Sequence, residues 1–126
     1  MREPIRDKGR LLHIIDAIGH VLKFTAGKSL DELSKNTIEY YGIIKCIEIV
    51  GEATYKLSSQ FKDAHPETPW RVIEKMRHVL VHGYYQVNPE DVYDVIRNDL
   101  QPLKVQVEQL LSSIDWDKWE KQNLDK

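Results

Sequence analysis

The chain has 126 residues, of which 41% are hydrophobic and 30% are charged, and its formal net charge is −2. This length fits one domain over residues 1–126, and the composition argues against a disordered chain. No apolar run approaches the length of a membrane span, and no signal peptide is readable. Cys46 is the only cysteine, so an intrachain disulfide and a zinc cluster are excluded, and we expect a cytoplasmic protein.

Two amphipathic helices are predicted in the first half of the chain. Apolar residues recur at helical spacing over residues 5–24. A second helix is predicted over residues 29–61, beginning with the capping-box spacing of Ser29 and Glu32. A rod of that length, about 45 Å, is longer than a compact bundle of this size needs. We therefore expect Gly42 or Gly51 to mark a bend, although Gly51 would equally permit close helix packing.

Two further helices are predicted in the second half. Thr68 is the expected N-cap of a helix over residues 69–81, with Pro69 in its first position and Gly83 as its stop. Another helix begins at residue 89 or 90 and continues to residue 110. Pro102 removes one backbone hydrogen bond from it and is expected to kink it.

The last segment, residues 112–126, is predicted to be a polar tail or a short helix. Trp116 and Trp119 are three residues apart, so they can form an apolar patch that docks on the bundle or on a partner, or they belong to a frayed end. Docking is the favoured interpretation. With no strand-like alternation or repeat in the sequence, the predicted fold is all-α, an antiparallel up-and-down bundle of four to five helices.

Histidines are the first candidates for chemistry. His13 and His20 lie one heptad apart on a helix and His65 precedes a proline in a turn, which is typical of surface positions. His78 and His82 are four residues apart, and a metal would need a third firm ligand beside them. Because no other cluster of ligands has recognisable spacing, we predict neither a metal nor another cofactor.

Basic residues surround those two histidines. Arg71, Lys75 and Arg77 place positive charge on the predicted helix, and His82 lies at its end before Gly83. Arginine holds phosphate oxygens with a permanent charge, and histidine exchanges a proton near neutral pH. These are the groups that cleavage of RNA by its 2′-hydroxyl requires. Since the net charge is negative, RNA affinity must come from such a local patch, to which Arg71 and Lys75 contribute.

Geometry leaves alternatives open for this segment. Residues five apart on a regular helix differ by about 140° in direction, so Arg77 and His82 would not face one phosphate. Either His82 leaves the regular helix before Gly83, or two copies share the groups across a two-fold axis. A purely structural interpretation also fits the pattern: Arg77 pairs with Glu74 or Glu48, His82 caps the helix and Tyr84 packs as an anchor.

The motif of Arg77, His82 and Tyr84 resembles that of the HepT-like branch of the HEPN superfamily: Arg, four residues, His, any residue, Tyr. Segments 10–18, 47–53 and 69–73 also resemble the family, and the similarity covers about residues 5–111. One departure is His78, where the family commonly has a polar residue such as Asn. It is a possible auxiliary group.

The resemblance implies a homodimer in which the two motif segments face each other, and a metal-independent endoribonuclease that acts as a toxin. Arg77 and His82 would be catalytic. The implied partner is an MNT-type nucleotidyltransferase antitoxin that transfers AMP to Tyr84 and thereby blocks RNA entry. An alternative is a non-catalytic HEPN subunit that binds nucleotide or substrate for such a nucleotidyltransferase, and a second is an interaction bundle without chemistry.

Overall fold

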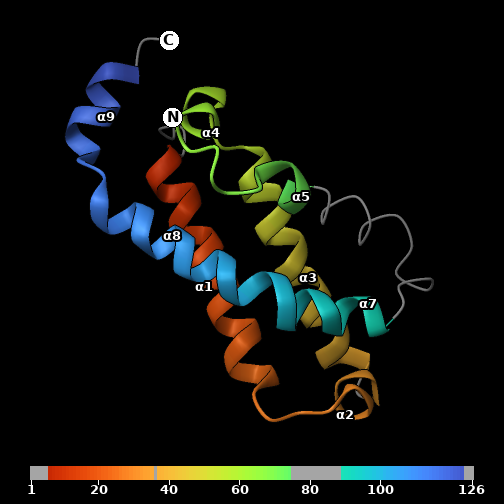
Figure 1. Cartoon of the computed structure of the whole chain (residues 1–126). Helices are drawn as coiled ribbons and strands as arrows, with labels where there is room; N and C mark the ends of the chain where they lie inside the picture. The colour runs from red at the N-terminus through yellow and green to blue at the C-terminus, as the bar shows by residue number, and fades with distance from the viewer. Residues whose placement is uncertain (1–5, 36, 75–88, 124–126) are drawn as a thin grey trace, which may run out of the picture.

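The fold is an all-α bundle, as predicted. The computed structural model describes residues 6–35, 37–74 and 89–123, and these ranges contain no strand. Three helices form the body of the bundle: α1 (Asp7–Thr25), α3 (Thr37–Tyr55) and α8 (Gln101–Ser113). Figure 1 shows α3 running antiparallel to α1, with α8 lying across α1. The other described elements are α2 (Leu30–Lys35), α4 (Ser59–Ala64), α5 (Trp70–Glu74), α7 (Pro89–Asp94), the π-helix η1 (Val95–Leu100) and α9 (Trp116–Asn123).

The core lies where α1, α3 and α8 meet. Ile14 and Ile18 from α1, Ile44 and Ile47 from α3, and Val107 from α8 are completely buried. Full burial of such a side chain contributes about 1.5–3 kcal/mol, so the amphipathic stripes account for the packing of these helices. No helix in the described ranges is long and apolar enough to cross a membrane.

The connector between α1 and α2 contains a glycine turn and the predicted cap. Gly27 has a φ of 73°, a left-handed conformation that glycine adopts without steric cost. The Lys28 amide donates to the Thr25 carbonyl at 3.0 Å. Ser29 Oγ accepts from the Glu32 amide at 3.3 Å and donates to the Glu32 carboxylate at 3.2 Å, so Ser29 caps α2 with the partner that the spacing predicts.

The prediction of one long helix over residues 29–61 is wrong. Three helices, α2, α3 and α4, occupy this stretch, and Gly42 and Gly51 both lie inside α3 instead of at a bend. The break after α3 has a tertiary cause. The Asp7 carboxylate accepts from the Ser58 amide at 2.8 Å and from its hydroxyl at 2.7 Å. Ser58 Oγ in turn accepts from the Phe61 amide at 3.1 Å, so Ser58 caps α4 and stops α3 from continuing.

Pro102 lies directly after a π-helical turn. The sequence predicts a kink there, and the structure has the six-residue π-helix η1 just before α8, whose first turn contains Pro102. A proline lacks the amide hydrogen that would close an α-helical bond, and its ring crowds the carbonyl four residues earlier. A wider π turn is one way to accommodate both effects.

The C-terminal segment docks on the bundle, as the favoured interpretation predicted. Trp116 is buried and its ring is stacked on Phe61 with centroids 5.9 Å apart, while Trp119 meets the same ring edge-on at 5.5 Å. Trp116 Nε1 donates to the Leu111 carbonyl at 3.0 Å, and Trp119 Nε1 donates to Asp7 at 3.3 Å. Residues 116–123 of the predicted tail therefore form the packed helix α9.

Candidate functional site

The described part of the candidate site is the corner between α4 and α5, which leads into the motif. Trp70 is buried at the start of α5, with its ring 6.0 Å from that of Phe61. Its Nε1 donates to the His65 carbonyl at 2.9 Å. Ile73, one turn later, is also buried. These contacts fix α5 against α4 and α3.

Thr68 does not cap α5 with its side chain, contrary to the prediction. The hydroxyl is buried and has no hydrogen-bond partner within the described residues. The backbone begins the helix instead: the Trp70 amide donates to the Thr68 carbonyl at 2.8 Å, and the Ile73 amide donates to the Pro69 carbonyl at 3.2 Å. Pro69 thus stands immediately before α5, where its missing amide hydrogen is not needed.

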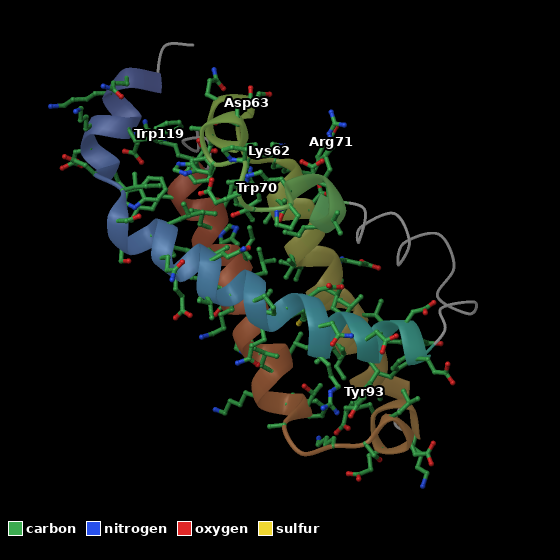
Figure 2. All side chains as sticks on the ribbon, in the orientation of Figure 1. Lys62, Asp63, Trp70, Arg71, Tyr93 and Trp119 are labelled. Carbon is green, nitrogen blue, oxygen red and sulfur yellow. The ribbon has the colours of Figure 1, made fainter. Side chains whose placement is uncertain are left out.

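An ion pair holds the end of α5. Lys62 Nζ donates to Glu74 Oε1 at 2.6 Å and to the Tyr55 carbonyl at 3.3 Å. The two charged side chains are only 20% and 22% exposed, so solvent weakens this pair less than a surface pair. In Figure 2, Lys62 and Trp70 lie together between α4 and α5. Glu74 is the last described residue before the motif and precedes Arg77 by three positions.

Of the predicted site residues, only Arg71 is described. It is exposed on α5, and Figure 2 shows its side chain projecting away from the bundle. That position is compatible with the predicted contact to RNA phosphate. The other predicted residues lie outside the described ranges: Lys75, Arg77, His78, His82 and Tyr84. Their roles remain predictions.

The carboxylates named in the structural interpretation of the motif both have lysine neighbours. Glu74 is bound by Lys62, as described above. Glu48 is buried, with Oε2 at 3.6 Å from Lys45 Nζ, while its Oε1 has no hydrogen-bond partner within the described residues. Residues 6–35, 37–74 and 89–123 also contain no group of three or more potential metal ligands.

Two hollows beside the α1–α2 connector were not predicted from the sequence. The first, about 680 Å³, has Lys28, Ser29, Glu32, Tyr93, Arg97 and Gln101 among its lining residues. The second, about 710 Å³, has His20, Lys23, Phe24, Lys28, Glu39 and Cys46 among them. Lys28 belongs to both. No sequence signal joins these groups, because Tyr93 and Arg97 are about 65 to 70 positions away from Lys28 and reach it through the packing of α7 on α2 and of η1 on α1.

Cys46 is not prepared for nucleophilic chemistry. Partial burial raises the pKa of its thiol, and the nearby Asp16 carboxylate raises it further. The thiolate is the reactive form of cysteine, so the shift makes the side chain less reactive at neutral pH. Burial likewise raises the pKa of Tyr40, with Tyr41 adding to the effect.

Comparison with known proteins assigns the chain to a family. Residues 14–110 match the profile of the family described as ribonuclease HepT-like. The chain belongs to this family. Because the matched range spans α1 to α8, it includes the Arg77, His82 and Tyr84 positions of the sequence.

Relatives of the family cover most of the chain. A protein of Thermococcus cleftensis named as a probable ribonuclease HepT is 31% identical over 103 residues, which is 82% of this chain and 94% of that protein. The candidate RNase MJ1380 of Methanocaldococcus jannaschii is 27% identical over 101 residues, covering 80% of this chain and 93% of its own length. The candidate RNase TTE0752 of Caldanaerobacter subterraneus is 29% identical over 101 residues, covering 80% and 90%. No solved structure matches the chain.

Proposed function

We propose that the protein is a metal-independent endoribonuclease of the HepT type, with Arg77 and His82 as its catalytic residues. The observation that carries this proposal is the family match over residues 14–110, within which the chain has the Arg–four residues–His–any residue–Tyr pattern at 77, 82 and 84. The names of the relatives, which refer to ribonucleases, support the same activity.

The proposed reaction uses the ribose 2′-hydroxyl as nucleophile. It attacks the adjacent phosphorus, the bond to the 5′-oxygen of the next nucleotide breaks, and a 2′,3′-cyclic phosphate forms. His82 acts as general base or general acid, which is typically worth about 10²- to 10⁴-fold in rate. Arg77 binds the scissile phosphate and stabilises the charge that develops on its oxygens. His78 is an auxiliary group in this scheme.

The α4–α5 corner, which the structure describes, supports this proposal. Trp70 and the Lys62–Glu74 ion pair fix α5 at both of its ends. A rigid element immediately before Arg77 is what a positioned catalytic cation requires, since small displacements of reacting groups reduce rates strongly. The exposed Arg71 adds a phosphate contact on the same helix.

Regulation is proposed to act on Tyr84. Its hydroxyl would attack the α-phosphorus of ATP on an MNT-type nucleotidyltransferase, forming a phosphodiester with AMP and releasing pyrophosphate. The added charge and bulk beside His82 would repel RNA. The protein itself is proposed to be a homodimeric toxin, in which a two-fold axis brings two motif segments to one cleft.

A ribonuclease assay tests the activity directly. Purified protein should cleave cellular RNA in the presence of EDTA, and Arg77→Ala and His82→Ala should each lose most of that cleavage. Lys118→Ala, an exposed change on α9, is the matched control and should keep full activity. His78→Asn, tested alongside, measures the auxiliary role. Intact RNA with the wild-type protein, or full cleavage by the Arg77 and His82 variants, would contradict the proposal.

The regulatory scheme needs a separate experiment. Incubation with an MNT-type nucleotidyltransferase and ATP should add AMP-sized masses to the wild-type chain and none to Tyr84→Phe. An ATP-dependent complex without modification, formed by a chain that leaves RNA intact, would favour the non-catalytic subunit instead. Light scattering on the same preparation should show a dimer.

A further inference from the structure

Lys28 and Arg97 are cations that contact aromatic rings instead of carboxylates. Lys28 Nζ lies 3.5 Å from the centre of the Phe24 ring. The Arg97 guanidinium carbon lies 5.3 Å from the centre of the Tyr93 ring, and its Nη1 donates to the Tyr93 hydroxyl at 2.8 Å. Within the described ranges neither cation has an ion pair with a carboxylate. Their charges are therefore available to an anion.

Many other cations in the described part of the chain are instead paired with carboxylates. The pairs Lys45–Glu48, Lys56–Glu52, Lys62–Glu74, Lys104–Glu108 and Arg6–Glu120 each join a cation to a carboxylate. The first hollow has one carboxylate, Glu32, which already accepts from the Ser29 hydroxyl. The acidic side chains of α7 do not line that hollow. The wall therefore carries two positive charges against one negative charge.

The first hollow combines the features that bind a nucleotide. Its volume is about 680 Å³, and it offers two cations, a tyrosine ring, a hydroxyl and the amide of Gln101. Single-stranded RNA is bound by stacking its bases on aromatic rings or on the guanidinium plane of arginine, with cations on its phosphates. In Figure 2, Tyr93 lies beside α2, on the side of the bundle where the α1–α2 connector passes.

We propose that this hollow is an RNA-binding subsite, in which a base stacks on the Tyr93–Arg97 pair and Lys28 contacts a backbone phosphate. The inference rests on the proposed ribonuclease function, because it concerns nucleotides that flank the one being cut. Lys28 also lines the second hollow, where Phe24 offers another ring and Lys23 another cation. The strand would therefore cross the α1–α2 connector.

The subsite is close to the motif along the chain. α7, which carries Tyr93, begins at Pro89, and only residues 85–88 separate it from Tyr84. An RNA that is cut at the motif extends over several nucleotides. Contacts to the flanking nucleotides increase affinity and direct the strand without taking part in the bond cleavage.

Binding is tested with an RNA that cannot be cleaved. A labelled 2′-O-methyl oligonucleotide of about ten nucleotides is titrated with the full chain, and fluorescence anisotropy gives Kd at several salt concentrations. Lys28→Ala/Arg97→Ala should weaken binding about tenfold. It should also reduce the slope of log Kd against log salt concentration by about 0.7 for each lost phosphate contact. Lys118→Ala/Lys121→Ala, the same charge change on exposed positions of α9, should bind like the wild type.

Two further variants separate stacking from charge. Tyr93→Leu keeps an apolar side chain but removes the ring, and it should weaken binding at least about fivefold. Arg97→Lys keeps the charge but loses the planar group, and it should weaken binding less than Arg97→Ala does. Circular dichroism and urea unfolding confirm that each variant is folded, and equal affinity of the folded variants and the control would overturn the proposal.

AMP alone distinguishes a free nucleotide from RNA. If AMP binds as tightly as the oligonucleotide and the Lys28/Arg97 variant abolishes this binding, the hollow serves a free nucleotide and the RNA proposal is wrong. The cleavage assay keeps the two proposals separate. Cleavage by the wild type with unchanged binding by the variants overturns only the subsite, whereas intact RNA with weakened binding by the variants overturns only the ribonuclease.

Discussion

Replacing Asp7 by alanine should destabilise the chain strongly although the residue lies in the first turn of the first helix. The side chain accepts from the Ser58 amide, the Ser58 hydroxyl and Trp119 Nε1, at 2.8, 2.7 and 3.3 Å. Hydrogen bonds to a charged group contribute about 1.5–3 kcal/mol each, and partial exposure puts these at the lower end. A carboxylate in the first turn of a helix adds about 0.5 kcal/mol. With about 1.5 kcal/mol for each Ser58 bond, under about 1 kcal/mol for the longer Trp119 bond and the contribution of the helix, Asp7→Ala should therefore cost about 4 kcal/mol.

Urea unfolding followed by circular dichroism measures this cost, and two smaller changes apportion it. Ser58→Ala removes the hydroxyl bond to Asp7 and the cap on the Phe61 amide, and it should cost about 2 kcal/mol. Trp119→Phe removes only the longest of the three bonds and should cost less than about 1 kcal/mol. The double change at Asp7 and Ser58 should cost less than the sum of the single changes. A loss below about 1 kcal/mol for Asp7→Ala, or strict additivity of the pair, would refute this explanation.

Three other outcomes follow from the contacts described above. Lys62→Glu and Glu74→Lys should each reduce RNA cleavage, and the double exchange should restore part of it; no recovery would show that the ion pair does not position α5. Phe61→Ala should cost about 3–5 kcal/mol in urea unfolding because the ring is fully buried, with Phe61→Leu as the milder control. Cys46 should react with iodoacetamide more slowly in the folded chain than in urea at neutral pH, and equal rates would count against its raised pKa. Since the folded chain holds the thiol proton more tightly, the stability from this group is present at low pH and is lost as pH rises through the raised pKa.

The long helices were predictable because their apolar spacing is regular. α1 and α8 follow the predicted stripes, and Ser29 caps the Glu32 amide as their spacing indicates. The division of residues 29–61 was not predictable in the same way. The cap at Ser58 depends on Asp7, which lies 51 positions earlier, and a local pattern carries no information about that contact.

The candidate site also shows that local sequence patterns do not predict long-range contacts. A short motif and a family resemblance named Arg77, His82 and Tyr84, but those positions lie outside the described residues and their roles remain predictions. The role of Lys62 was not predicted, because nothing in the local sequence indicates that it binds Glu74 twelve positions later. The sequence around Arg97 is that of an ordinary surface cation. Its position beside the α1–α2 connector results from the packing of η1 and is not visible in the local sequence.

The docking of α9 places this helix beside the start of α1. Arg6 lies 3.5 Å from Glu120, and the start of α1 and α9 are neighbours at one end of the bundle in Figure 1, opposite α2. A circularly permuted chain, with its old ends joined by a short linker, should therefore fold to the same bundle. Affinity tags on either end would lie far from the α1–α2 connector, and dyes on both ends would report the undocking of α9 as a loss of energy transfer.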